Sequence, residues 1–131
     1  MTPDELSSVG LQYDVDGPVA TVTITRPSAR NAQTPQMWST LARIGDEIPA
    51  AVRVVVVSGE GSSFSAGLDR AVLDPTNPDG VGGLLAAGDD DASAQIGEWQ
   101  RAFTWLRNPQ FISIAKVRGY AIGAGFQLAL S

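Results

Sequence analysis

Alternation of apolar and polar residues marks the beginning of the chain. Residues 19–25 read VATVTIT, in which Ala20, Val22 and Ile24 alternate with threonines. A period of two with many β-branched residues is typical of a strand with one buried face. A second such run, residues 11–15, precedes it across the turn sequence Asp-Gly-Pro. The two runs therefore predict a β-hairpin.

Two longer stretches place apolar residues three or four positions apart, which is the spacing of an amphipathic helix. Thr34 is a suitable helix cap, Pro35 suits the first helical position, and Pro49 ends the first stretch. The apolar positions are Met37, Leu41, Ile44 and Ile48 in the first stretch and Ile96, Trp99, Phe103 and Leu106 in the second. We interpret the aromatic pair of the second stretch as core residues.

Two short apolar runs, residues 53–59 (RVVVVSG) and 111–117 (FISIAKV), are rich in β-branched side chains. Such runs are typical of strands covered on both faces, as in a parallel sheet. Because helical stretches separate the strands, the chain predicts an α/β fold with right-handed crossovers around a largely parallel sheet. Residues 74–91 are rich in Pro, Gly and Asp and predict a mobile surface loop, with a lid over a ligand as the alternative.

Composition narrows the possible functions. A chain of 131 residues with 44% hydrophobic content predicts one globular domain. The net charge of −5 and the scattered arginines disfavour nucleic-acid binding. The absence of Cys and His excludes disulfides, Cys or His metal sites and Ser–His–Asp triads. The polar N-terminus is unlike a signal peptide and no apolar run approaches the ~20 residues of a membrane helix, so we expect a cytoplasmic protein away from membranes.

A glycine-rich loop follows each of the two apolar strands. The first contains GSSFSAGLD (residues 61–69) and the second RGYAIGAG (residues 118–125). Ligands of α/β sheets bind beyond the carboxyl ends of strands, and glycine lets the backbone approach closely. If the strands are neighbours, the loops converge, and two backbone N–H groups there could form an oxyanion hole. The alternative is that both loops are ordinary turns. A dinucleotide-binding motif fits poorly, because its third glycine is missing.

Three segments resemble the enoyl-CoA hydratase/isomerase family, the crotonases. They are FSAGLD (residues 64–69), VRGYAIGAGFQLALS (residues 117–131) and ITRPSARNA (residues 24–32). The resemblance implies crotonase-like ββα repeats of the ClpP/crotonase fold. Residues 1–131 would be the N-terminal part of a single spiral domain, without the C-terminal helical region. For a full-length parent it implies a homotrimer or hexamer.

The resemblance also implies an acyl-CoA thioester as substrate. The backbone N–H groups of Ala66 and Ala124 would form the oxyanion hole that polarises the thioester. The segment 28–31 would lie beside the CoA adenine, with Arg30 as a candidate phosphate contact. The remaining substrate-binding positions by resemblance are Gly67, Leu68 and Asp69, although we interpret the Asp69 carboxylate as structural, capping the following turn. Coenzyme A enters as part of the substrate, with no further cofactor and no metal.

The sequence departs from the family at its acid–base residues. Gln127 stands where hydratases carry the first of two glutamates, and an amide does not titrate near neutrality. The second glutamate would match a position beyond Ser131. The residues therefore support thioester binding and polarisation better than hydration, and we expect this chain to be inactive as a hydratase. A non-catalytic acyl-CoA-binding module is one alternative. A truncated fragment without ligand, which predicts an exposed apolar face, is the other.

Overall fold

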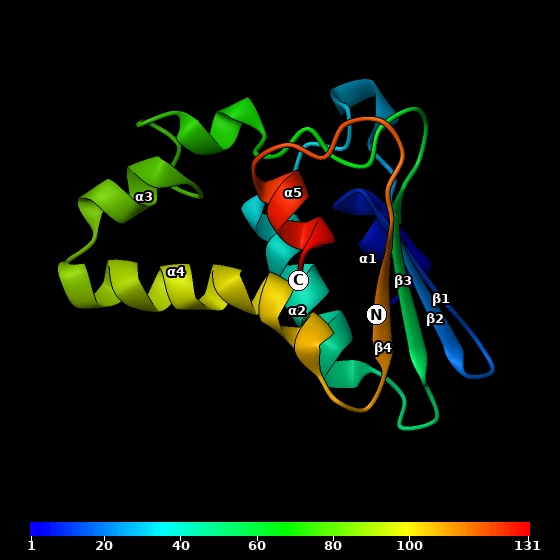
Figure 1. Ribbon diagram of the computed structural model, residues 1–131. Coiled ribbons are helices and arrows are strands. Elements are labelled where there is room, and N and C mark those ends of the chain that lie inside the picture. Colours follow the sequence, from blue (N-terminus) through cyan, green and yellow to red (C-terminus); the bar gives the residue numbers. More distant parts are fainter.

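A computed structural model describes all residues from 1 to 131 and shows a four-stranded sheet with helices on one face (Figure 1). The helices are α1 (Pro3–Ser8), α2 (Pro35–Glu47), α3 (Val81–Ala86), α4 (Asp89–Thr104) and α5 (Ala124–Ala129). The strands are β1 (Leu11–Asp16), β2 (Val19–Ile24), β3 (Val54–Gly59) and β4 (Ile112–Lys116). Short 3-10 turns occupy Pro27–Ala29, Arg70–Leu73 and Trp105–Arg107. In Figure 1, α2, α4 and α5 lie on the same side of the sheet, and α3 with the first part of α4 projects away from it.

The sheet has the order β1-β2-β3-β4 and confirms the predicted topology. Strands β1 and β2 form the antiparallel hairpin, with Leu11 opposite Ile24. Strand β3 runs parallel to β2, and β4 runs parallel to β3. The carboxyl ends of β3 and β4 therefore lie side by side at one edge of the sheet, where the two glycine-rich loops begin.

The prediction that the two apolar strands are covered on both faces is wrong. In β3 only Val55 and Val57 are buried, and in β4 the side chains of Ile112 and Ile114 are 69% and 48% exposed. Helices cover one face of the sheet only, so the opposite face carries apolar side chains without a cover. Further exposed apolar residues follow β4 in the chain: Val117, Tyr120, Ile122, Phe126 and Leu130. The exposed apolar face that the fragment hypothesis predicts is thus present.

Helix α2 provides much of the core. Its buried side chains are Pro35, Met37, Trp38, Leu41, Ala42 and Ile44, which face the sheet and α4 at helical spacing. The Thr34 side chain accepts a hydrogen bond from the Met37 N–H at 3.2 Å, as expected of an N-cap. The Trp38 ring lies 5.4 Å from the ring of Trp99 on α4.

No helix of the structure combines the length and the apolarity needed to cross a membrane.

Residues 74–91 contain regular structure, in contrast to the irregular loop that the sequence predicts. Helix α3 lies within this segment, and Asp89, Asp90 and Asp91 form the exposed first turn of α4. Carboxylates stabilise the amino end of a helix through the backbone dipole, which explains why three aspartates begin this one. Helix α3 has no buried residue of its own.

The N-cap of α2 gives a test of the fold. We expect Thr34→Ala to lower the free energy of unfolding by about 1 kcal/mol, because the Met37 N–H loses its acceptor. Thr40→Ala is the matched control, since its hydroxyl only donates to the Gln36 carbonyl on the exposed side of the same helix. Urea unfolding of both variants measures the difference. Equal stability of the two variants would contradict the assigned cap.

Candidate functional site

The two glycine-rich loops are joined by backbone hydrogen bonds just beyond β3 and β4. The N–H groups of Phe64 and Ser65 donate to the carbonyls of Arg118 and Tyr120 at 2.7 and 2.9 Å. The Ile122 N–H donates to the Ser65 carbonyl at 3.0 Å. Ser65 and Ala121 form a parallel bridge that continues the pairing of the strands. The prediction that the loops converge is confirmed.

Glycines permit this close approach. A Cβ on Gly125 would lie 2.4 Å from the Ser65 carbonyl oxygen, so α5 could not pack against the first loop with any larger residue there. Gly67 has a φ of +94°, and a Cβ on it would lie 2.6 Å from the Ile122 carbonyl oxygen and 3.5 Å from the Ala124 nitrogen. Gly67 therefore lies close to the Ala124 nitrogen, with no side chain between the two loops.

Ala124 is the first residue of α5 and its N–H has no acceptor in the structure. The first N–H groups of a helix have no partner within the helix, which leaves them free for another acceptor. The residue is only 7% exposed, so bulk water reaches this donor poorly. The neighbouring Gly123 N–H also lacks an acceptor, but it is the Ala124 nitrogen that faces Gly67.

In the first loop, the backbone amide without an acceptor is not the one that the sequence predicted. The Ala66 N–H donates to the Arg30 carbonyl at 2.9 Å and is therefore occupied. The Leu68 N–H has no acceptor. Leu68 forms a parallel bridge with Gln33, whose N–H and carbonyl bond to Gly67 and Asp69 at 2.7 and 2.8 Å. In such a bridge the middle residue turns its own N–H away from the partner strand, which here leaves the Leu68 N–H unpaired.

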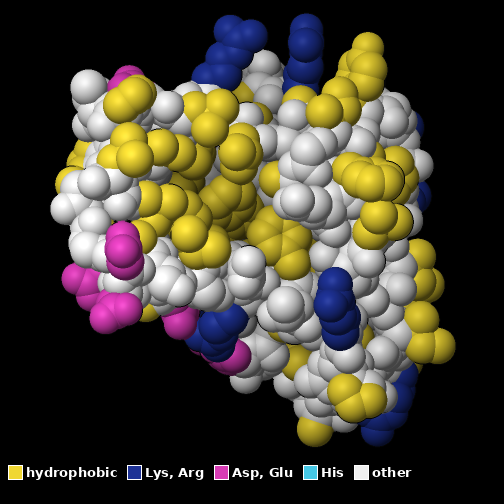
Figure 2. Space-filling model, turned by 60° about the vertical axis from the view of Figure 1, so that its left-hand side comes forward, with side chains coloured by type: hydrophobic (Ala, Val, Ile, Leu, Met, Phe, Trp, Pro, Cys, Tyr) yellow, Lys and Arg dark blue, Asp and Glu magenta, His cyan; other side chains and the backbone are white.

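The Leu68 and Ala124 residues line one apolar cavity of about 560 Å³, visible as a hollow bordered by hydrophobic side chains in Figure 2. Its wall is formed by Trp38, Val72, Val81, Ile96, Trp99 and Phe103, together with Ala66, Gly67 and Gly123. The interpretation of Trp99 and Phe103 as core residues is therefore incomplete, because both also border the cavity. Helical spacing cannot separate these two roles, since core and cavity lie on the same face of α4.

Apart from the indole N–H groups of its tryptophans, the cavity wall has only two polar side chains, both carboxamides. Gln127 on α5 and Gln100 on α4 are exposed, and neither side chain has a hydrogen-bond partner within the protein. Gln127 is a predicted site residue, whereas no sequence pattern predicted Gln100. No Asp, Glu, Lys or Arg lines this cavity. A molecule in this cavity would therefore meet backbone N–H donors and side-chain amides, but no group that titrates near neutral pH.

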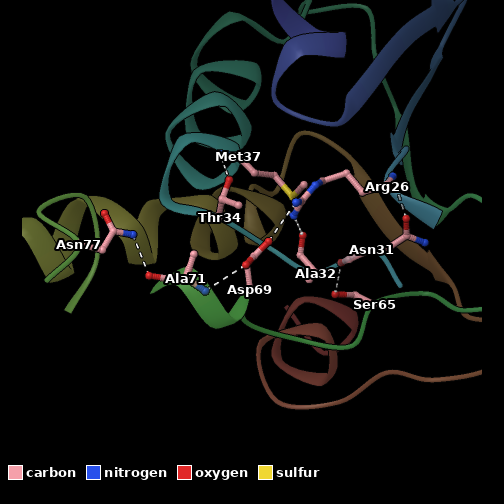
Figure 3. Close-up of polar contacts among 9 residues, drawn as sticks. All are labelled: Arg26, Asn31, Ala32, Thr34, Met37, Ser65, Asp69, Ala71 and Asn77. Atoms are coloured by element: carbon pink, nitrogen blue, oxygen red, sulfur yellow. Dashed lines mark hydrogen bonds and ion pairs between the residues drawn. The ribbon is translucent and has the colours of Figure 1, made fainter. Parts of the chain in front are cut away.

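The Asp69 carboxylate does not line the apolar cavity, and Figure 3 shows it bound to Arg26 and Ala71. One oxygen accepts from the Ala71 N–H at 3.1 Å and the other pairs with Arg26 at 2.9 Å. These bonds, that of Ala71 first, lower the pKa of Asp69 below its ordinary value. The interpretation of Asp69 as a structural cap is confirmed. Arg26 also donates to the Ala32 carbonyl and so anchors the segment that precedes α2.

A second cavity, of about 670 Å³, adjoins the first. Arg30, Asp69 and Arg70 line it beside Ser28, Ala29, Ala32 and Ile122, and it shares Ala66 and Leu68 with the apolar cavity. Arg30 and Arg70 form no ion pair in the structure.

Arg30 and Asn31 adopt left-handed backbone conformations with φ of 52° and 55°. This turn is held by the buried Asn31 side chain, which donates to the carbonyls of Glu60 and Ser63 at 2.8 and 2.7 Å.

The Asp69 contacts predict a pH dependence of stability. A lowered pKa in the folded state means that the contribution is complete above the ordinary value of 3.8 and is lost as pH falls through the folded value. We expect Asp69→Asn to lower the free energy of unfolding by about 1 kcal/mol at pH 7, a figure reduced for partial exposure of the pair. The variant should lose less stability than the parent as the pH falls to 3.

Asp79→Asn is the matched control for this measurement, because its carboxylate accepts no hydrogen bond and forms no ion pair. Urea midpoints at pH 7 and pH 3 for the three proteins give the comparison. If Asp69→Asn and Asp79→Asn show the same midpoints at both pH values, the Asp69 contacts do not stabilise the fold.

Comparison with known proteins is consistent with this arrangement. The family model "Enoyl-CoA hydratase/isomerase" matches residues 14–131. The chain is 32% identical to the "Putative enoyl-CoA hydratase EchA13" of Mycobacterium tuberculosis, in an alignment that covers 97% of this chain and 44% of that relative. It spans about half the length of the curated relatives it matches.

Solved structures give the same result. A putative enoyl-CoA hydratase from Thermobifida fusca YX in complex with acetoacetyl-CoA superposes with a TM-score of 0.92 at 47% identity, covering 98% of this chain and 51% of that one. Its complex with CoA superposes with a TM-score of 0.86 at 46% identity and similar coverage of 99% and 49%. The expected crotonase fold is confirmed, as about half of a full-length crotonase structure. The chain belongs to the enoyl-CoA hydratase/isomerase family.

Proposed function

We propose that this chain binds acyl-CoA thioesters and polarises the thioester carbonyl between the N–H groups of Leu68 and Ala124. The observation that carries the proposal is that both amides lack an acceptor while their residues border the same apolar cavity. A thioester oxygen placed between them accepts both hydrogen bonds. This assignment replaces the Ala66 N–H with that of Leu68, because Arg30 already occupies the former.

The setting of the two donors favours charge on the bound oxygen. The cavity wall is mainly apolar, so little water competes for the N–H groups and each bond is stronger than it would be in water. One such fixed donor stabilises a developing oxyanion by about 3–4 kcal/mol. Loss of a proton next to the carbonyl, which moves negative charge onto that oxygen, is the step that this geometry assists.

The two cavities correspond to the two ends of the ligand. The apolar cavity takes the acyl group, whose chain contacts Trp99 and Phe103. The second cavity takes the nucleotide end, where the unpaired guanidinium groups of Arg30 and Arg70 supply charge for phosphates. Leu68 borders both cavities, which puts the thioester at the junction. The Thermobifida fusca relative was solved with acetoacetyl-CoA and with CoA, which supports this choice of ligand.

Hydration requires an acid–base residue, and this chain places none in the wall of the apolar cavity. Adding water to an enoyl group needs a residue that takes up and returns protons, and the wall offers only the amides of Gln100 and Gln127. We therefore propose binding and polarisation, without hydration by the chain as it stands. The alternatives are a non-catalytic acyl-CoA-binding module, which has the same cavity, and a fragment that binds no ligand.

Removal of one donor tests the oxyanion hole. We expect Leu68→Pro, which lacks an N–H, to weaken binding of acetoacetyl-CoA about tenfold relative to binding of CoA, because one buried hydrogen bond to an anionic oxygen is lost. Leu68→Ala keeps the amide and is the matched control at the same position. Isothermal titration of both variants with both ligands gives the four constants. Equal ratios for the two variants would exclude the Leu68 N–H.

The absence of a titratable group predicts the outcome of a turnover assay. Incubation of the purified chain with crotonyl-CoA should leave the enoyl absorbance unchanged, whereas titration with the same compound should show binding. Steady loss of the absorbance, proportional to protein concentration, would show that a group outside the cavity wall moves the proton. Failure of every acyl-CoA to bind would favour the fragment hypothesis.

A further inference from the structure

We propose that Ser65 and Gln33 form a buried polar link that fixes the orientation of the Leu68 N–H and connects it to the Trp38 wall of the acyl cavity. Both are positioning residues, because neither borders the cavity. The inference rests on the proposed function for its catalytic meaning, but the orientation of the amide can be measured without any ligand.

The link is completely buried, and each of its side-chain polar atoms has a hydrogen-bond partner. Ser65 and Gln33 are both 0% exposed. The Ser65 hydroxyl donates to the Asn31 carbonyl at 2.7 Å and accepts from the Gln33 side-chain amide at 3.1 Å and from the Gly67 N–H at 3.2 Å. A hydroxyl has one proton and two lone pairs, so its capacity is filled. Buried polar side chains cost free energy unless paired, and apolar residues would fill this space without that cost. The polar pair therefore has a role beyond filling the core.

What the link holds is the peptide that carries the Leu68 amide. The Gly67 N–H bonds to the Ser65 hydroxyl, and the Gly67 carbonyl accepts from the Gln33 backbone N–H at 2.7 Å. The Gly67 carbonyl and the Leu68 N–H belong to one trans peptide, in which they point in opposite directions. Because the carbonyl is fixed toward Gln33, the Leu68 N–H is fixed away from it.

The glycine at position 67 explains why this support is needed. Its φ of +94° is open to few other residues, and glycine has the greatest backbone freedom in the unfolded chain. A donor that follows a glycine loses its direction unless both neighbouring peptides are held. Ser65 and Gln33 hold one peptide each, from the buried side of the loop.

The other end of the link reaches the acyl cavity. The Trp38 indole N–H donates to the Gln33 side-chain oxygen at 2.8 Å. The Trp38 ring borders the cavity and lies 5.4 Å and 6.2 Å from the rings of Trp99 and Phe103. One glutamine amide thus sets both the position of an aromatic wall residue and, through Ser65, the turn that carries the oxyanion donor.

The first experiment measures the amides in the ligand-free protein by NMR. In Ser65→Ala we expect the Gly67 amide to exchange at least about fivefold faster with solvent, because its acceptor is gone, and the Leu68 amide resonance to move. Ser63→Ala is the matched control, a buried serine in the same loop whose hydroxyl makes no hydrogen bond. Unchanged Gly67 exchange and Leu68 resonance in Ser65→Ala would overturn the proposal whatever the protein binds.

The second experiment measures the consequence for the ligand. We expect Ser65→Ala to weaken acetoacetyl-CoA binding about fivefold, to leave CoA binding within about twofold, and to raise the pKa at which bound acetoacetyl-CoA forms its enolate. Equal weakening of both ligands, with that pKa unchanged, would show a merely structural role and overturn the proposal. If the parent chain binds no acyl-CoA while the NMR result holds, the proposed function fails and the positioning of the amide stands.

A second variant covers the case in which Ser65→Ala does not fold. Gln33→Met has a similar length and shape but neither donates to Ser65 nor accepts from Trp38. We expect the same movement of the Leu68 resonance, together with a change in tryptophan fluorescence. Unfolding of both variants would show that the link is required for the fold itself and would overturn its role as a positioning device.

Discussion

The site depends on the backbone pairing that continues the sheet beyond the ends of β3 and β4. Bonds between residues 64–65 and 118–122 close the gap between two loops that are more than fifty positions apart in sequence. That contact brings both loops to the cavity, because α5 begins where the second loop ends. The packing tolerates no side chain at Gly125, so the separation of the two amides is set by glycine contacts and not by flexible groups.

The cavity combines strong hydrogen-bond donors with an absence of charge. In apolar surroundings an amide N–H acts strongly on an oxygen that gains negative charge, while a carboxylate nearby would oppose it. The one carboxylate of segment 64–69, that of Asp69, is bound by Ala71 and Arg26 and borders the second cavity instead. In the proposed function these two cavities have separate tasks, polarisation in the apolar cavity and phosphate recognition in the second, and Leu68 lines both.

Sequence patterns predicted what is decided locally. The hairpin and α2 with its Thr34 cap follow from spacing and residue type within short windows, whereas the convergence of the glycine loops also requires that β3 and β4 are neighbours. The identity of the free amide does not, because it depends on the pairing of Leu68 with Gln33, which brings together segments on either side of α2 and β3. The exposure of β4 was not predicted for a similar reason, because an apolar run alone does not show whether one or both faces of the strand are covered. Gln100 was missed because an exposed glutamine on a helix has no pattern of its own.

The weak packing of helix α3 affects how selective the apolar cavity is. It contributes Val81 to the wall, yet none of its residues is buried, so few apolar contacts oppose its detachment. Segments of this kind open at a small fraction of the free energy of global unfolding. The inner wall, by contrast, is built from tryptophans anchored in the core. If the apolar cavity takes an acyl group as proposed, discrimination is strict beside the tryptophans and lax toward α3, where a longer chain displaces a loosely held helix at little energetic cost.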